Sequence, residues 1–184
     1  MPVLVTPTTR VHASFLEAMA EFVAEGRGGL YDHSGLGHES RAYASSWGTP
    51  SGFERYVTDL LAEALEESPR PAGYVPQTTL WWVEDDSYLG RVGIRHRLTP
   101  ALIEVGGHIG YDVRPTARRR GHATAMLQTA LPVARGLGID EALLTCDVDN
   151  EASRRVILSA GGVLEDQHQG KLRFWVPTGR GRAG

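Results

Sequence analysis

The stretch that decides the fold is VRPTARRRGHATAML, residues 113–127. A strand ends at its first residue, an arginine-rich turn follows Pro115, and an amphipathic helix begins directly after Gly121. The first turn of a helix presents unpaired backbone N–H groups and about half a positive charge, and small residues there let an anion approach closely. Arginine side chains can add charge-assisted hydrogen bonds. The stretch therefore predicts a phosphate-binding cradle, made of Arg118, Arg119, Arg120, Gly121, His122, Ala123 and Thr124.

A solvated turn is the alternative interpretation of the three arginines, because runs of charge usually face water. The neighbouring sequence favours the cradle. A strand over residues 141–148 follows the helix, and Asn150 and Ser153 then open a second helix, so two helix N-termini flank neighbouring strand ends. The P-loop pattern Gly-x4-Gly-Lys-Ser/Thr is absent from the sequence, which disfavours an ATP site.

Hydrophobic periodicity predicts the elements around the cradle. Three segments rich in β-branched and aromatic residues, 78–83, 87–98 and 105–113, are separated by turn signals and predict an antiparallel meander. Period-3.6 patterns predict helices over 11–24, over 53–65 after a cap at Ser51, over the segment that begins at 123, and over 151–160. Residues 163–166 and 171–176 are expected to form a final strand pair. Glycines punctuate residues 26–37, and this stretch is expected to be a mobile loop.

Composition limits the possible classes of protein. The chain has 184 residues, which predicts one domain over residues 1–178 and a disordered tail over 179–184. The single cysteine, Cys146, excludes an intramolecular disulfide. The net charge of -3 argues against a nucleic-acid partner, and no apolar run approaches the roughly 18 residues of a membrane helix. No secretory leader is visible, so we expect a cytoplasmic protein with no membrane partner.

With these residues the chain resembles the GNAT superfamily of N-acetyltransferases, and in particular a bacterial branch of predicted acetyltransferases without an assigned substrate. The acyl-coenzyme A signature of the superfamily is Gln/Arg-x-x-Gly-x-Gly/Ala, and Arg118, Gly121 and Ala123 match it. Downstream, Asn150, Ser153, Val156 and Gly161 stand where the family usually has Asn, Ala or Ser, an aliphatic residue and Gly. The chain departs from the family at Ile157, which replaces a frequent tyrosine, and at Gly162, which replaces a phenylalanine.

The resemblance implies a mixed α/β fold with a central, mostly antiparallel sheet, a splayed pair of parallel strands and flanking helices. It implies acetyl-CoA as co-substrate and direct transfer of the acetyl group to a primary amine of a small molecule or a peptide. The pyrophosphate would lie on the cradle, near Asn150 and Ser153, and the pantetheine arm would run along the backbone of Tyr111 and Val113 as a false strand. A homodimer is also expected.

Transfer to an amine needs a proton acceptor, because an amine with a pKa near 10.4 is almost fully protonated at pH 7. His108 is the first candidate, since it can titrate near physiological pH, and Glu104 is the second. A hydrogen-bonded, partly buried histidine without a catalytic role is the alternative for His108. Tyr111 or water is the candidate proton donor to the leaving thiolate.

The sequence says least about the residues that bind the acceptor substrate. Tyr31 and Glu39, in and near the glycine-rich loop, and Arg95 and His96, on the second predicted strand, are the candidate substrate-binding residues. His33 and His38 lack suitable carboxylate neighbours, so no metal site is predicted. Two other functions stay open: a non-catalytic acyl-coenzyme A sensor, which the loss of tyrosine at Ile157 favours, and an O-acyltransferase.

Overall fold

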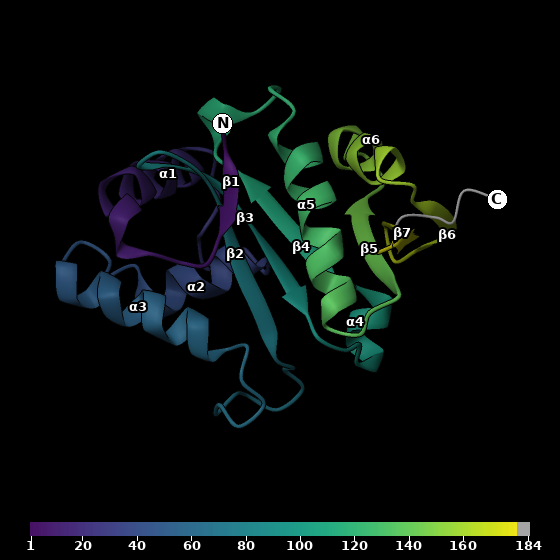
Figure 1. The fold of residues 1–184 in the computed structure, drawn as a ribbon, viewed down its shortest axis with the longest axis horizontal. Helices are drawn as coiled ribbons and strands as arrows, with labels where there is room; N and C mark the ends of the chain where they lie inside the picture. The colour runs from purple at the N-terminus through teal and green to yellow at the C-terminus, as the bar shows by residue number, and fades with distance from the viewer. Residues whose placement is uncertain (180–184) are drawn as a thin grey trace.

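Two β-sheets lie side by side in the computed structural model, which describes residues 1–179 (Figure 1). The first sheet has the order β1 (Val3–Val5), β2 (Gln77–Glu84), β3 (Ser87–Arg95) and β4 (Ile109–Val113). The second has the order β5 (Glu141–Asp147), β7 (Lys171–Pro177) and β6 (Val163–His168). All pairs within a sheet are antiparallel, which confirms the predicted meander of β2, β3 and β4 and the final strand pair.

The helices lie on both faces of these sheets. Before β2 come η1 (Thr9–Val11), α1 (His12–Ala24), α2 (Gly35–Tyr43) and α3 (Pro50–Ala62); later come α4 (Pro100–Glu104), η2 (Pro115–Ala117), α5 (His122–Gly136) and α6 (Glu151–Ser159). We call the side of the first sheet that α1, α2 and α3 cover the α1–α3 face, and the opposite side the α5 face. Trp81 and Trp82 are both buried but belong to different cores, one on each face, as the alternation of a strand requires.

The last strand of the first sheet, β4, and the first strand of the second, β5, run in the same direction next to each other (Figure 1). They belong to different sheets because they separate along most of their length. The chain just before β4 is bonded to β5: the N–H of His108 donates to the carbonyl of Leu143 at 2.7 Å, and the N–H of Gly106 donates to Oγ1 of Thr145 at 3.2 Å. We call the opening between β4 and β5 the seam. This arrangement confirms the predicted mixed α/β fold with a splayed strand pair.

A glycine keeps the closed end of the seam together. Gly107 has a φ of 64°, and a Cβ on it would lie 2.3 Å from the carbonyl oxygen of Leu143. Any other residue would therefore push β5 away at the point where the two sheets meet.

Several predicted boundaries are wrong in detail. The segment 26–37 was expected to be irregular throughout, but α2 begins at Gly35, because the hydroxyl of Ser34 accepts the N–H of Gly37 and caps the helix. The cap of α3 is Thr49 rather than Ser51, with Pro50 as its first residue. Helix α4 was not predicted, and α5 begins at His122, one residue before its predicted start. Of the predicted disordered tail, only Gly179 lies within the described residues. No helix in residues 1–179 is both long and apolar enough to span a membrane.

Candidate active site

The backbone between β4 and α5 has the shape of an anion cradle. Gly121 is the N-cap of α5 with a left-handed φ of 81°, no side chain caps the helix, and a Cβ at this position would meet nothing within 4 Å. Arg119 is also left-handed, with a φ of 62°. Within residues 1–179, the N–H groups of residues 119–124 have no protein acceptor. Adjacent donors without partners at a helix N-terminus fit a diphosphate.

Of the three arginines that were predicted to bind an anion at the cradle, one is already paired with a protein carboxylate. Arg118 forms a two-pronged ion pair with Glu25, with both N–O distances 2.8 Å, and its Nε donates to the carbonyl of Val113 at 3.1 Å. It therefore ties the turn to the end of α1 and to β4. Arg119 and Arg120 are exposed, and neither has an ion pair with any described residue. These two supply the positive charge that is available to an anion.

The first turn of α5 is fixed by a contact with the core of the α5 face. The Nδ1 atom of His122 accepts the indole N–H of Trp82 at 3.2 Å, so the imidazole is held against the core of the α5 face. Ala123 and Thr124 are half-buried. These three residues offer an anion their backbone N–H groups.

The edge of β4 that faces the seam is unpaired. The N–H of Arg95 donates to the carbonyl of His108, and the N–H of Arg114 donates to the carbonyl of Leu89, both at 2.8 Å. These two bonds determine which residues of β4 are hydrogen-bonded to β3. By the alternation of an antiparallel ladder, the N–H and C=O groups of Ile109, Tyr111 and Val113 point toward β5. They pair with no described strand, although Arg118 occupies the Val113 carbonyl. An extended ligand could add to this edge as a strand.

Tyr111 reaches from β4 across the α5 face to α6. Its hydroxyl lies 2.7 Å from Oγ of Ser153, whose N–H is capped by Oδ1 of Asn150 at 3.0 Å. Burial raises the pKa of Tyr111 to about 12, against the hydrogen bond with Ser153, which lowers it. The structure thus brings the predicted residues Tyr111, Asn150 and Ser153 together at the open end of the seam.

His108 lies at the closed end of the seam and is buried. Its Nδ1 accepts the N–H of Leu143 at 2.9 Å, in addition to the bond that its own N–H makes to the Leu143 carbonyl. A neutral imidazole that accepts a hydrogen bond at Nδ1 carries its proton on Nε2, so it has no free nitrogen lone pair with which to take a proton from a substrate. Burial, and secondarily the charge of Arg95, lowers the pKa of His108 and keeps it neutral. This geometry favours a positioning role for His108 over the predicted proton acceptor.

Glu104 lies away from the other candidates. It is exposed at the end of α4 and contacts the β6–β7 turn, with Nε2 of His168 at 2.5 Å and Nε2 of Gln169 at 3.1 Å. Its carboxylate therefore joins α4 to the second sheet.

Arg95, the last residue of β3, and His96, which follows it, are predicted substrate-binding residues that point in opposite directions. Arg95 is on the α1–α3 face, and its Nη1 donates to the carbonyls of Gly106 and Gly107 at 3.3 and 3.1 Å. His96 follows it on the α5 face and bonds to Oγ1 of Thr78 at 2.8 Å. Of the two, only Arg95 lies on the α1–α3 face, where the predicted substrate-binding residue Glu39 also lies.

Glu39 is at the centre of a buried polar cluster on the α1–α3 face. It accepts the hydroxyl of Tyr56 at 2.5 Å and forms an ion pair with Arg91, and both side chains of the pair are almost fully buried. Arg91 lies 3.7 Å from Asp112, which is also bound by Nη1 of Arg27 at 2.6 Å. Glu39 is therefore occupied by protein partners rather than open to a substrate.

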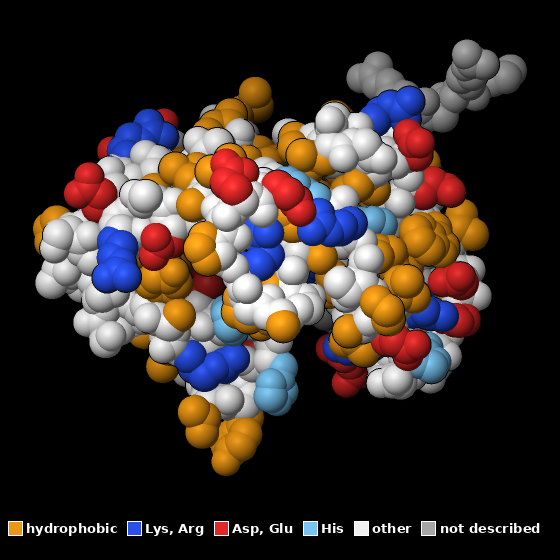
Figure 2. Space-filling view, turned by 90° about the horizontal axis from the view of Figure 1, so that it is seen from below, with side chains coloured by type: hydrophobic (Ala, Val, Ile, Leu, Met, Phe, Trp, Pro, Cys, Tyr) orange, Lys and Arg blue, Asp and Glu red, His pale blue; other side chains and the backbone are white. Residues whose placement is uncertain are grey.

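The loop after α1 is held onto β4 by Arg27 and shaped by Asp32. Burial raises the pKa of Asp32, but hydrogen bonds from Gly28 and Ser34 and the charge of Arg27 lower it to about 2. Tyr31, at the tip of this loop, is 86% exposed. A notch opens in the surface between the helical lobe on the left and the lobe of the second sheet on the right (Figure 2). A histidine and basic side chains lie on the left rim of this notch.

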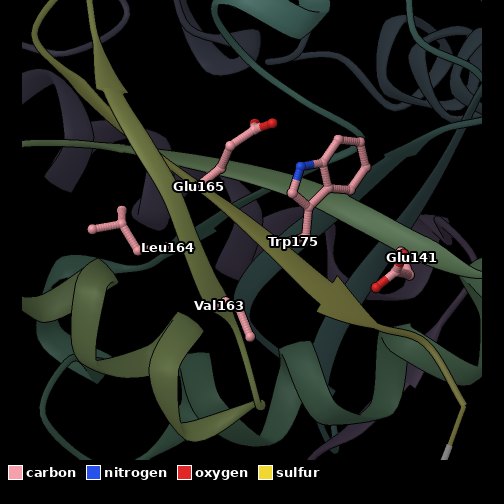
Figure 3. A pocket seen from close by; sticks show the side chains of 5 residues that line it. All are labelled: Glu141, Val163, Leu164, Glu165 and Trp175. Atoms are coloured by element: carbon pink, nitrogen blue, oxygen red, sulfur yellow. The ribbon is translucent and has the colours of Figure 1, made fainter.

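A second hollow lies over the second sheet, on the side where Trp175 stands between Glu141 and Glu165 (Figure 3). None of the predicted site residues lines it. In residues 1–179, no three His, Cys, Asp or Glu side chains are grouped closely enough to hold a metal ion.

Sequence reasoning missed Glu63. It directly follows α3, is half-buried, and carries no hydrogen bond or ion pair on its side chain within the described part of the chain. Burial, with the nearby charge of Glu39, raises the pKa of Glu63 to about 7. The only signal in the sequence is its spacing, because it extends the apolar stripe of α3 by one turn.

Comparison with known proteins identifies the family. The family profile described as "Acetyltransferase (GNAT) domain" matches residues 30–163, which is most of the chain. No curated protein sequence matches the chain.

Solved structures with this fold cover nearly the whole chain. RimJ of Mycobacterium smegmatis, in complex with CoA-disulfide, has a TM-score of 0.64 at 17% identity and covers 96% of this chain and 81% of its own. The Microcin C7 self immunity acetyltransferase MccE, in complex with acetyl-CoA and AMP, has a TM-score of 0.63 at 13% identity, with coverages of 96% and 92%. The PaiA N-acetyltransferase of Thermoplasma acidophilum, in complex with coenzyme A, has a TM-score of 0.57 at 11% identity. The match covers 96% of this chain and 99% of that one. At these identities the likeness concerns the fold.

Proposed function

Because the chain belongs to the GNAT acetyltransferase domain family and is an acyltransferase, we propose that it moves the acetyl group of acetyl-CoA to a primary amine by direct attack in a ternary complex. Neighbours of the same fold are described as acetylating the N-terminal serine of a ribosomal protein or as ribosomal-protein-alanine acetyltransferases. These descriptions support a peptide amine as the acceptor, and our proposal also includes a small-molecule amine.

The observation that carries the proposal is the continuity of unpaired backbone donors from the cradle to the seam. Among the described residues, the N–H groups of residues 119–124 have no acceptor, and the edge of β4 that leads away from them has no strand partner at Tyr111. A ligand with a diphosphate followed by an extended amide-bearing arm fits this pattern, and coenzyme A has both parts.

In this arrangement the chain's own backbone positions the reacting group. The cradle holds the diphosphate, and Tyr111 and Val113 hold the arm along β4. The bound thioester supplies an activated acyl carbon. A backbone N–H of β4 that points into the seam would stabilise negative charge on the carbonyl oxygen, and one such donor is typically worth roughly 3 kcal/mol.

Tyr111 is the proposed proton donor to the leaving thiolate. It lies on the strand that would hold the arm, and Ser153 keeps its hydroxyl at 2.7 Å in a fixed position. It takes the place of the tyrosine that the family often has at the position of Ile157.

A non-catalytic sensor is the second candidate. Ile157 is completely buried in the core of the α5 face, so α6 offers no hydroxyl at the usual position. A sensor would bind coenzyme A tightly without releasing thiol, whichever acceptor is present.

Gly121→Glu tests the cradle. The substitution puts a carboxylate beside the N–H groups that would hold the diphosphate, and it strains a left-handed position. We expect calorimetry to show no measurable binding of coenzyme A, while the fold is kept because a Cβ at Gly121 meets no other atom. Gly136→Glu is the matched control, since it makes the same change at the other end of α5, also in open space, and is expected to bind normally.

Unchanged affinity of Gly121→Glu would contradict the cradle. Thiol release from acetyl-CoA, measured with panels of amines and of alcohols, then separates the remaining functions. Release with amines supports N-acetylation, and release with alcohols alone supports O-acylation.

A further inference from the structure

The guanidinium group of Arg95 lies at the closed end of the seam. The N–H of Arg95 donates to the carbonyl of His108, and its half-buried side chain reaches along the α1–α3 face to the chain just before β4. There Nη1 donates to the carbonyls of Gly106 and Gly107 at 3.3 and 3.1 Å. Gly107 packs directly on the carbonyl of Leu143 in β5. The charge of Arg95 is therefore held at the point where the two sheets meet.

Other arginines of the sheets that are removed from solvent pair with acids, but Arg95 does not. On β3 itself, Arg91 pairs with Glu39, and on β7 Arg173 pairs with Asp166 at 2.6 Å. No carboxylate of residues 1–179 forms an ion pair with Arg95. Burial, and after it the charge of Arg91, lowers the pKa of Arg95. A guanidinium nevertheless stays protonated in proteins, so Arg95 carries a positive charge that no described residue neutralises.

Part of the Arg95 guanidinium is free to bind a ligand. Nη1 is occupied by the two carbonyls, but Nε and Nη2 form no hydrogen bond with any described residue. The fully enclosed side-chain nitrogens and oxygens that lack a partner in residues 1–179 belong to Trp47, Trp81 and Tyr88, so Nε and Nη2 of Arg95 are accessible to solvent. The N–H groups on this edge of a guanidinium are parallel, and they match the two oxygens of a carboxylate.

The direction of β4 places Arg95 near the reacting end of the arm that the proposed function lays along this strand. Strand β4 begins at Ile109, beside the closed end of the seam, and ends at Val113, beside the cradle. A ligand with its diphosphate on the cradle and its arm along Val113 and Tyr111 directs its acyl group toward Ile109. His108 precedes Ile109, and Arg95 is bonded to His108 across the β3–β4 pair. Because an acetyl group carries no charge, an anion that binds Arg95 belongs to the acceptor.

Resting on the proposed function, we propose that Arg95 determines acceptor specificity by binding a carboxylate that the acceptor carries in addition to its amine. The Nε and Nη2 edge of Arg95 holds the carboxylate while the amine faces the acyl group. Charges interact more strongly where protein excludes water, so this ion pair is stronger than one on the surface. A phosphate fits less well, because about two negative charges would meet a single cation. The acceptor is then an amino acid, or a peptide with an acidic residue near its N-terminus.

Matched pairs of amines test this specificity in the natural protein. β-Alanine and γ-aminobutyrate are compared with their amides, and the amide of alanyl-aspartate with that of alanyl-asparagine, at equal concentrations of the neutral amine. We expect kcat/KM for thiol release to be about 10- to 100-fold higher for the carboxylate member of a pair. A preference among the free amino acids identifies a small-molecule acceptor, and a preference in the dipeptide pair identifies a peptide.

Equal kcat/KM within every pair would overturn the role of Arg95 while acyl transfer itself stands. Absence of thiol release with every amine would instead overturn the proposed function.

Arg95→Gln assigns the preference to this residue. We expect kcat/KM for the carboxylate member to fall to that of its amide, with no change for the amide or in coenzyme A affinity by calorimetry. Arg95→Lys should keep part of the preference, because it keeps the charge but not the fork of donors. Arg97→Gln is the matched control, since Arg97 is exposed and paired with Glu66, and it should keep the whole preference. An equal loss for both members of a pair would show that Arg95 has a structural role alone.

Chemical modification of the natural protein gives a measurement that does not depend on a variant or on turnover. Phenylglyoxal modifies accessible arginines, and mass spectrometry of peptides follows the reaction at Arg95. In the presence of coenzyme A, the preferred carboxylate at about ten times its dissociation constant should slow this modification about 10-fold, because it occupies the guanidinium. Its amide should have no effect. Equal rates with the carboxylate and the amide would overturn the proposal.

Discussion

At the scale of single residues, His108 joins the two sheets through its ring as well as its backbone. The N–H of Leu143 has Nδ1 of His108 as its partner, and both residues are buried. A buried N–H that loses its partner costs about 1–3 kcal/mol, because it was desolvated on folding and gains nothing in return. The imidazole therefore stabilises the closed end of the seam.

We expect His108→Ala to lower the free energy of unfolding by about 1–3 kcal/mol. His108→Asn should lose less, since its side-chain oxygen can accept the same N–H. Urea denaturation of both variants measures the difference. If the two variants lose the same amount, the ring bond to Leu143 does not contribute to stability.

The sequence placed some site residues better than others, for physical reasons. The cradle depends on backbone conformation, which Gly121 and the strand-turn-helix pattern specify locally, so it could be predicted. Whether His108 has a free nitrogen lone pair depends on its contact with Leu143, and whether Glu39 is open to a substrate depends on its contact with Arg91. Both partners are far away in the chain. Glu63 was missed for the same reason, because its pKa comes from burial and from charges on other elements.

At the scale of elements, α6 depends on its cap. Asn150 Oδ1 accepts the N–H of Ser153 at 3.0 Å, and the same Ser153 holds the hydroxyl of Tyr111. The cap thus orients both the helix and the side chain that crosses to it from β4.

Asn150→Ala should cost about 1 kcal/mol of unfolding free energy, because it leaves an N–H of the first turn of α6 unsatisfied. Asn150→Asp should be close to the natural protein, since aspartate is an equally good cap. Thermal or chemical denaturation of the pair provides the measurement. Equal stability of the alanine and aspartate variants would show that the cap has no energetic role.

Elements with a complete hydrophobic pattern were predicted, and those without one were not. Helix α3 buries Phe53, Tyr56, Val57 and Leu60 on one stripe and was found from the sequence. Helix α2 buries Leu36, Gly37 and Glu39, so two of its three inward positions are not hydrophobic, and its glycines indicate a loop. It forms because Ser34 caps it and because Glu39 finds Arg91 in the folded state, neither of which a hydrophobic period can reveal.

At the scale of the whole molecule, the ion pair of Glu39 and Arg91 joins α2 to β3 inside the core of the α1–α3 face. Removing one member leaves the other charged and desolvated, which typically costs 3–5 kcal/mol. Replacing both members avoids that penalty. The pair is therefore expected to show strong coupling.

We expect Arg91→Met to destabilise the protein by about 3–5 kcal/mol, and Arg91→Met combined with Glu39→Gln by less than Arg91→Met alone. The glutamine can still accept the hydroxyl of Tyr56. A double-mutant cycle by guanidinium denaturation measures the coupling. Additive losses would mean that the two side chains do not interact in solution.

The divergence of β4 from β5 has a further consequence for how the chain behaves in a crowded solution. A strand with free donors and acceptors is normally a template on which another polypeptide can aggregate. Here that template is the edge of the first sheet that faces β5 and packs against α5, so it lies inside the molecule and not at its outer surface. The protein can therefore keep an unfilled hydrogen-bonding row for a slender ligand without exposing that row to misassembly with other chains.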